Sequence, residues 1–314
     1  MSIHNDEMLD IFKKLLLARL FEERVHKLSL EGVVLGSVHL SIGEEAASVG
    51  TISALKKEDY ILPTHRGHVQ HLTKGADPSR LMAELAGKET GYCKGISGSI
   101  HIFDKENNNL GSNGIVGAQF PIAVGAGLAI KYKKKNNIVA CFFGDGSSNQ
   151  GWFYELLNLS SLWSLPVIFI CINNLYGMGT PYSETSVAKV YEKAIPFKIK
   201  TDVVDGNDVY KVYESMKAIV DYVRGNSKPA LLECLTYRWM GHSCHDQRPY
   251  RPVEEINEWK AKDPVKIAEK YLIKKGFARE KIDGSEADIN VLLDNAEKFA
   301  KESNFAEFSD NMQL

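Results

Sequence analysis

Two apolar runs with a helical pattern between them dominate the middle of the chain. The runs cover residues 138–143 and 166–172, and residues 152–163 have the periodicity of a helix. A short, continuous apolar run is consistent with a strand that is buried on both faces of a sheet. The pattern therefore predicts a strand–helix–strand unit. Ligands bind beyond the carboxyl ends of such parallel strands.

Weaker patterns on either side of this unit predict further elements. Helices are expected at 7–30, 44–55, 78–86, 118–130 and 208–224, and strands at 60–63, 203–204 and 230–237. The alternation of strands and helices favours a three-layer α/β/α fold with a mainly parallel sheet. We expect a single domain over residues 1–314, with a charged helical C-terminal extension from about residue 254.

Small residues mark two segments of the chain. Glycine is dense over residues 87–117, which predicts backbone that turns closely around a ligand or another chain. Residues 118–130 are rich in alanine and glycine, and glycine is a poor helix former. A helix there makes sense where another backbone packs closely against it. We therefore predict an internal or subunit contact helix.

Composition excludes several functional classes. The formal net charge is −2, which gives no indication of a nucleic-acid partner. No apolar run approaches the ~20 residues that span a bilayer, and the polar N-terminus has no signal-peptide pattern. Five cysteines, an odd number without a CxxC pair, favour buried thiols in a reducing compartment over a disulfide framework. A cytoplasmic protein without membrane contact is expected.

The chemistry in the central unit lies just beyond its two strands. The first strand ends in Gly144-Asp145-Gly146, and the second ends in Asn173-Asn174. Glycine allows an anion to approach the backbone, and the following helix offers free N–H groups. Asp145 and Asn174 supply oxygen ligands of the kind that Mg²⁺ shares with phosphate. Two plain turns are the alternative, but this pairing after successive apolar strands argues against it.

The GDG and NN pair, with residues 147–172 between, resembles the cofactor motif of enzymes that use thiamine diphosphate. Further blocks follow the order found in one family: HLSIGEEA (39–46), THRGH (64–68), GKETGYCKGISGSIHIF (87–103), NGIVGAQFPIAVGAG (113–127), NNLYGMGTP (173–181) and TYRWMGHS (236–243). Together they resemble the E1 alpha subunit of 2-oxo acid dehydrogenase complexes, in the pyruvate and acetoin dehydrogenase branch. The resemblance covers roughly residues 8–270. It implies the thiamine diphosphate-binding fold.

The resemblance implies how the cofactor is held. Asp145, Asn174 and the main-chain carbonyl of Tyr176 match the ligands of Mg²⁺ in that family. Gly146 and Ser147 match positions whose backbone N–H groups bind the diphosphate.

Other cofactor contacts are implied by three further blocks. Gly114 and Val116 match positions at the aminopyrimidine end of thiamine diphosphate. Arg66 matches an arginine on the diphosphate, where a guanidinium can form charge-assisted hydrogen bonds. His242 matches a histidine near the phosphate. His65 stands where pyruvate enzymes usually carry tyrosine, and it resembles the acetoin-type enzymes instead.

Histidines are the implied catalytic residues. His39 and His68 match histidines that line the active-site entrance, and with His65 and His242 they would orient substrate and move protons. Ile172 stands where many relatives carry a charged residue. His245-Asp246 replaces a Ser-Asp pair that is common after GHS, which affects the detail of the loop over the cofactor.

The implied function is the E1 reaction. The enzyme would decarboxylate a 2-oxo acid oxidatively, with pyruvate as the first candidate, and transfer the acyl group to the lipoyl group of E2. Acetoin cleavage is the alternative that His65 favours. A glutamate needed at the aminopyrimidine would come from a separate E1 beta subunit, in an α2β2 heterotetramer.

Three rival functions remain open. Half of a split transketolase shares GDG and NN, but should lack the THRGH and NGIVGAQ blocks. A non-catalytic homologue would have no need of Asp145, Asn174 and Arg66. A nicotinamide-dependent dehydrogenase ranks low because no GxGxxG follows an early strand.

Overall fold

A computed structural model describes residues 3–307 of the 314-residue chain. Residues 1, 2 and 308–314 of the predicted domain lie outside this range. The helices are α1 (Asn5–Leu30), α2 (Glu45–Ser53), α3 (His68–Lys74), α4 (Pro78–Leu85), α5 (Gln119–Tyr132), α6 (Gly151–Leu162), α7 (Val190–Ala194), α8 (Val209–Asn226), α9 (Val253–Lys260), α10 (Pro264–Lys274) and α11 (Arg279–Glu302). The strands are β1 (Tyr60–Leu62), β2 (Val139–Gly144), β3 (Val167–Asn173), β4 (Tyr176–Gly177), β5 (Thr180–Pro181), β6 (Lys200–Asp205) and β7 (Ala230–Leu235).

Five strands form the central sheet in the order β1-β2-β3-β7-β6, and each neighbouring pair is parallel. Every residue of β3 is buried, as the continuous apolar run predicted. β2 and β3 are adjacent, with Gly144 opposite Ile172. The residues that follow these two strands therefore meet at one edge of the sheet. The predicted mainly parallel α/β architecture is confirmed.

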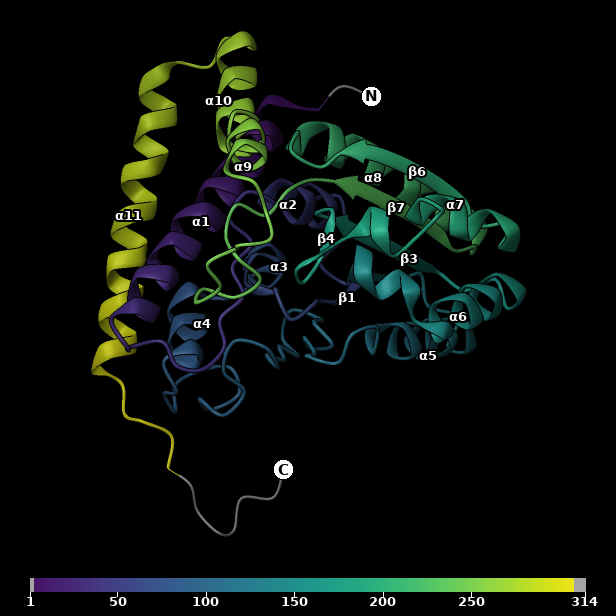
Figure 1. The fold of residues 1–314 in the computed structure, drawn as a ribbon, viewed down its shortest axis with the longest axis horizontal. Coiled ribbons are helices and arrows are strands. Elements are labelled where there is room, and N and C mark those ends of the chain that lie inside the picture. Colours follow the sequence, from purple (N-terminus) through teal and green to yellow (C-terminus); the bar gives the residue numbers. More distant parts are fainter. Residues whose placement is uncertain (1–2, 308–314) are drawn as a thin grey trace.

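Helices cover both faces of this sheet (Figure 1). Alternate residues of one strand face opposite layers: Phe142 packs in the core with α2 and α8, and Phe143 packs in the core with α5, α6 and α7. On the α5 side, Phe143, Phe153 and Phe169 gather around Phe120, with ring centroids 5.0–6.2 Å from that of Phe120. The layers are thus α2 and α8, the sheet, and α5 to α7.

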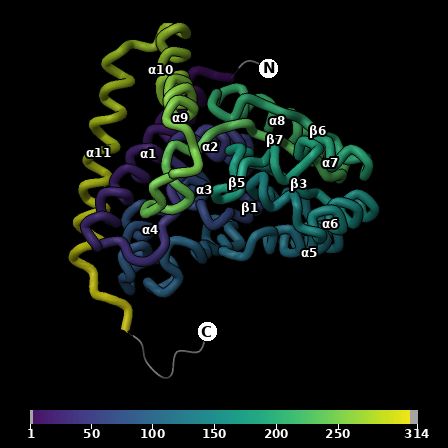
Figure 2. The backbone as a smooth tube through the Cα atoms, in the orientation of Figure 1, coloured from purple at the N-terminus to yellow at the C-terminus, as the bar shows by residue number. Residues whose placement is uncertain are grey.

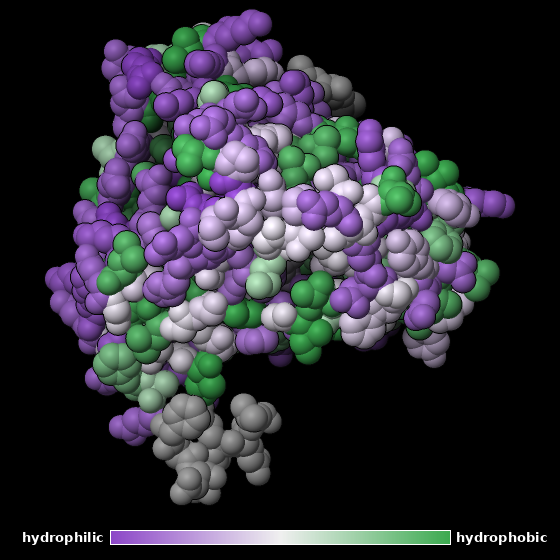
Figure 3. Space-filling model, viewed as in Figure 1, coloured by the Kyte–Doolittle hydropathy of each residue, from purple (hydrophilic) through white to green (hydrophobic). Residues whose placement is uncertain are grey.

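A second, helical core lies beside the sheet. Apolar residues of α1, α4, α10 and α11 share one cluster, and α11 runs along α1 (Figures 1 and 2). Hydrophilic side chains dominate the outer edge over α10 and α11 (Figure 3). Arg19 of α1 forms ion pairs with Glu45 and Asp263, which ties α1 to α2 and to the start of α10. The predicted extension from residue 254 starts within α9, and α10 and α11 pack into this core.

The glycine-rich segment turns around the chain's own carboxylate. Glu84, which is buried, accepts hydrogen bonds from the backbone N–H groups of Cys93, Gly95 and Ser97 at 2.7–2.9 Å. A Cβ at Gly95 would lie 2.5 Å from the carbonyl carbon of Gly87, and Gly95 has a φ of +74°. Close approach within the chain therefore accounts for the glycine at position 95, and the ligand or second chain that we expected around the segment stays a prediction.

Two further findings bear on the predictions. The segment between Asn174 and Ile199, which shows no regular pattern in the sequence, contains the β4–β5 hairpin and α7; elements of two to five residues are too short to show a period. All five cysteines are free, and Cys141, Cys171 and Cys234 are buried in strands, as expected. No helix in residues 3–307 is long and apolar enough to cross a membrane.

Candidate functional site

The carboxyl ends of β1, β2 and β3 open onto one cavity of about 370 Å³. Its wall includes the predicted residues that follow these strands, because parallel strands present their carboxyl ends at the same edge. The predicted site residues in this wall are His39, His65, Arg66, Gly114, Val116, Asp145, Gly146, Ser147, Asn174, Tyr176 and His242. The sheet thus brings together segments that are far apart in the sequence.

Asp145 lines the cavity and has a carboxylate oxygen without a partner among the described residues. Its side chain is 2% exposed, and its Oδ2 has no hydrogen-bond partner among the described residues. Burial raises the pKa of Asp145 to about 6. A buried carboxylate oxygen without a partner is costly, so a cation here would stabilise it. This arrangement fits the predicted Mg²⁺ ligand.

Asn174 and Tyr176 face the same cavity from the turn after β3. Asn174 Nδ2 donates to Glu44 Oε2 at 2.8 Å, and the backbone N–H of Tyr176 donates to Asn174 Oδ1 at 3.4 Å. The hydroxyl of Tyr176 donates to Glu255 Oε2 at 2.9 Å, which anchors its ring. The amide oxygen of Asn174 is therefore oriented away from Glu44, as an oxygen ligand requires.

Arg66 is held in the wall by backbone carbonyls. Its Nη1 donates to Leu40 O at 2.7 Å, and its Nη2 donates to His242 O at 3.0 Å. Burial lowers the pKa of Arg66 to about 10, and Arg238 acts in the same direction. The guanidinium remains charged at neutral pH. It therefore supplies a buried positive charge to the cavity and joins the loops at residues 40 and 242.

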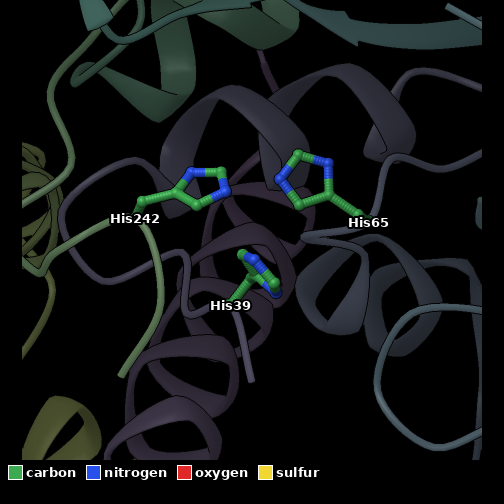
Figure 4. A group of neighbouring side chains, drawn as sticks. All are labelled: His39, His65 and His242. Atoms are coloured by element: carbon green, nitrogen blue, oxygen red, sulfur yellow. The ribbon is translucent and has the colours of Figure 1, made fainter. Parts of the chain in front are cut away.

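Three histidines turn their rings toward one another (Figure 4), and Arg66 acts on each of them as a positive neighbour. His39 precedes α2, His65 follows β1 and His242 follows β7; their ring centroids are 4.8–5.6 Å apart. Burial lowers the pKa of His39 to about 3 and of His242 to about 4, and Arg66 adds to both effects. Burial also holds the pKa of His65 well below its ordinary value. All three imidazoles are thus neutral at pH 7.

Neutral imidazoles this close together can hold a transition metal, but the surrounding charge argues against a cation. One ring nitrogen from each histidine lies within 4.8 Å of the others. Arg66 and Arg238 both act on His65 and His242 as positive neighbours. A positive potential favours an anion, such as a diphosphate, over a second cation.

The structure does not place His68 in the cavity wall that we predicted for it. His68 starts α3 and is fully buried. Its Nδ1 lies 3.2 Å from Glu22 Oε2, and its Nε2 lies 2.8 Å from Ser99 Oγ. Both ring nitrogens are therefore engaged inside the protein. The entrance position was wrong because the helical turn after Gly67 directs this side chain inward.

Gly114 and Val116 are exposed residues of the cavity wall. Val116 is half exposed, and Gly114 lies close to the side chains of Ile100 and His101. A Cβ at Gly114 would approach Ile100 Cγ2 to 3.1 Å, so the backbone comes near this wall. Gly114 and Val116 thus expose both backbone and apolar surface to a ligand.

Sequence reasoning missed two charged residues of the wall, Glu44 and Arg238. Both are buried and both line the cavity. Arg238 Nε donates to Met240 O at 3.1 Å, and its Nη2 donates to Met178 O at 3.2 Å. An arginine between two aromatic residues, shortly after a strand, was a signal that could have identified Arg238. Glu44 gave a weaker signal, because an acidic residue at a helix start is common.

Known proteins resemble this chain along nearly its whole length. The family model described as dehydrogenase E1 component matches residues 13–309. The alpha subunit of acetoin:2,6-dichlorophenolindophenol oxidoreductase from Bacillus subtilis is 39% identical, with 99% of this chain and 93% of that protein covered. The pyruvate dehydrogenase E1 component subunit alpha of Rickettsia bellii is also 39% identical, with 98% and 93% covered. The chloroplastic alpha-3 subunit from Arabidopsis thaliana is 38% identical, with 96% and 72% covered.

These matches confirm the E1 alpha resemblance that the motifs predicted. The family model covers the segments that line the cavity as well as the helical core, from α1 to α11. The chain belongs to the dehydrogenase E1 component family.

Proposed function

We propose that this chain is the alpha subunit of an E1 component that decarboxylates a 2-oxo acid oxidatively and transfers the acyl group to the lipoyl group of E2. Pyruvate is the first candidate substrate, because two of the relatives are named as pyruvate dehydrogenase subunits. Membership of the E1 family implies the use of thiamine diphosphate. The observation that carries the proposal is the buried, unpartnered oxygen of Asp145 at the carboxyl edge of the sheet.

The residues present fit thiamine diphosphate and Mg²⁺. Asp145, Asn174 and the carbonyl of Tyr176 would hold the metal, and the N–H groups of Gly146 and Ser147 would bind the diphosphate. When bound, thiamine diphosphate supplies a nucleophilic carbon and an electron sink for breaking the bond next to a carbonyl. The metal assignment rests on the oxygen donors, which are the ligands that Mg²⁺ prefers.

The other wall residues act on charge, orientation and protons. Arg66 and His242 would stabilise the diphosphate, and Gly114 and Val116 would contact the aminopyrimidine end. His39 Nδ1 and His65 Nε2 are buried without hydrogen-bond partners among the described residues. A neutral imidazole with a free nitrogen can accept a proton or orient a substrate oxygen. His68 would contribute only by positioning the loop that carries His65.

A separate E1 beta subunit would complete the site in an α2β2 heterotetramer. Among the described residues that line the cavity, the carboxylates are Glu44, which accepts a hydrogen bond from Asn174, and Asp145, the proposed Mg²⁺ ligand. The glutamate that the aminopyrimidine needs would therefore come from the partner. An exposed apolar face on α5, which contains Ile122, Leu128 and Tyr132, supports this partnership.

Acetoin cleavage is the second candidate function. His65 lies in the cavity wall, and a relative at 39% identity is named for acetoin. Co-expression with an E1 beta subunit allows both substrates to be compared. Reduction of 2,6-dichlorophenolindophenol with pyruvate would support the first function, and reduction with acetoin alone would support the second.

Cofactor binding tests the proposal directly. The co-expressed chains should bind thiamine diphosphate only when Mg²⁺ is present, as measured by tryptophan fluorescence. Asp145→Ala should abolish this Mg²⁺-dependent binding. Asp208→Ala is the matched control, because that aspartate caps α8 outside the cavity and its loss affects stability alone. Unchanged Mg²⁺-dependent binding by Asp145→Ala would refute the site.

A further inference from the structure

Glu44 is a buried carboxylate in the cavity wall with no place in the proposed chemistry. It lies at the N-terminal boundary of α2, and its residue is 3% exposed. Both carboxylate oxygens are engaged by protein groups: Oε2 accepts from Asn174 Nδ2 at 2.8 Å, and Oε1 lies 3.4 Å from Arg66 Nε. These two partners are the residues proposed to contact the metal and the diphosphate. Glu44 therefore bridges the two halves of the cofactor site.

The contact with Asn174 determines the direction of its amide. An ionised carboxylate only accepts hydrogen bonds, whereas an amide has one accepting end and one donating end. The end of Asn174 that faces Glu44 must therefore be the NH₂ group, and Oδ1 must face the other way. If the amide turned over, its donating end would face the cation, which binds only oxygen. The energy of this choice comes from a charge-assisted hydrogen bond in a buried place.

The contact with Arg66 places the guanidinium in the wall. The two terminal nitrogens of Arg66 donate to Leu40 O and His242 O, and the Nε side faces Glu44. The carboxylate is the ion-pair partner of Arg66 among the described residues. Loss of the negative charge would leave a buried guanidinium held only by carbonyl groups.

We propose that Glu44 is a positioning residue that aims the amide oxygen of Asn174 at the metal and holds Arg66 toward the diphosphate. This inference rests on the proposed Mg²⁺ and thiamine diphosphate site. Glu44 acts through Asn174 and Arg66, and its own oxygens are occupied by these two groups. Residues that orient metal ligands in this way typically contribute about 10- to 100-fold to metal affinity.

The first test is Glu44→Gln in the co-expressed alpha and beta chains. A glutamine can present either end of its amide to Asn174, and it carries no charge for Arg66. We expect the Kd for Mg²⁺ at saturating thiamine diphosphate, measured by tryptophan fluorescence, to rise about 10- to 100-fold. A Kd within twofold of the wild-type value would overturn the proposal.

Glu45→Gln is the matched control for this variant. Glu45 is the next residue and is fully buried, but its carboxylate pairs with Arg19 away from the cavity. This change should lower the melting temperature and leave the Kd for Mg²⁺ at its wild-type value. An equal loss of Mg²⁺ affinity in both variants would show that Glu44 acts only through general stability, and would overturn the proposal.

An exchange of the two side-chain types gives a test that a purely structural role would fail. Asn174→Asp would place a second carboxylate next to that of Glu44, and the repulsion between the two should weaken Mg²⁺ binding. Adding Glu44→Gln restores a donor and an acceptor with the same total charge, so the double variant should bind Mg²⁺ more tightly than Asn174→Asp alone. Additive losses in the double variant would contradict the proposal.

The outcomes separate this inference from the proposed function. If the wild-type chains show no Mg²⁺-dependent binding of thiamine diphosphate, the proposed function fails before any Glu44 variant is compared. If the wild type binds and Glu44→Gln binds equally well, only the role of Glu44 fails.

Discussion

His39 offers a quantitative test of the electrostatics in the cavity. Its side chain is 7% exposed, and burial together with Arg66 lowers its pKa to about 3. The unfolded chain titrates the same imidazole near its ordinary pKa of 6.5. Between these values the unfolded state binds a proton that the native state does not. The native state therefore loses stability as the pH falls from about 6.5 toward 3.

The size of this effect follows from the two pKa values. A pH of 5 lies about 1.5 units below the pKa of the imidazole in the unfolded chain. This difference corresponds to about 2 kcal/mol of unfolding free energy. His39→Gln removes this titration, because an amide does not bind the proton. We expect the free energy of unfolding to fall about 2 kcal/mol less between pH 7 and pH 5 in the variant than in the wild type.

The assay is urea unfolding followed by circular dichroism at pH 7, 6 and 5. His71→Gln is the comparator: His71 is buried outside the cavity, and burial lowers its pKa to about 3 as well. Both variants should reduce the pH dependence. Inorganic diphosphate should weaken the contribution of His39 to the pH dependence and leave that of His71 unchanged, because an anion bound in the cavity favours the imidazolium of His39. Equal losses of stability in wild type and His39→Gln would refute the reasoning.

Three further changes test packing and assembly. Gly127→Val should lower stability by about 1–3 kcal/mol in urea titrations, because a Cβ at Gly127 already meets Val167 Cγ2 at 2.6 Å. Arg19→Met should cost about 3–5 kcal/mol in the same assay, since it leaves the fully buried Glu45 without its ion-pair partner. Tyr132→Glu places a charge at an 87% exposed position on α5 and should prevent co-purification with the beta subunit while the melting temperature of the chain stays unchanged.

Local pattern was sufficient for the central unit of the fold. The apolar runs at 138–143 and 166–172 became β2 and β3, and the residues after them, Asp145 and Asn174, line one cavity. The prediction succeeded because strand period and turn chemistry are local properties, and parallel strands leave their carboxyl ends at one edge. The motifs also identified the family, which the comparisons confirmed.

Contacts between distant loops could not be predicted from the hydrophobic pattern of the sequence. The hydrogen bond between Glu44 and Asn174 joins residues 130 positions apart, and Arg238 reaches the cavity through backbone contacts to Met178 and Met240. His68 is the opposite case: its motif predicted a position at the active-site entrance, but the fold buries its side chain against Glu22. Side-chain direction after a loop depends on how the whole layer packs.

The sequence by itself determined the parallel strands, the two turns that carry Asp145 and Asn174, and the family. The tertiary structure alone decided which charges face one another. Burial beside Arg66 keeps His39 neutral, and Glu44 directs the amide of Asn174. The reason is physical: periodicity and turn propensity act over a few residues, whereas desolvation and ion pairing depend on every segment that packs around a side chain.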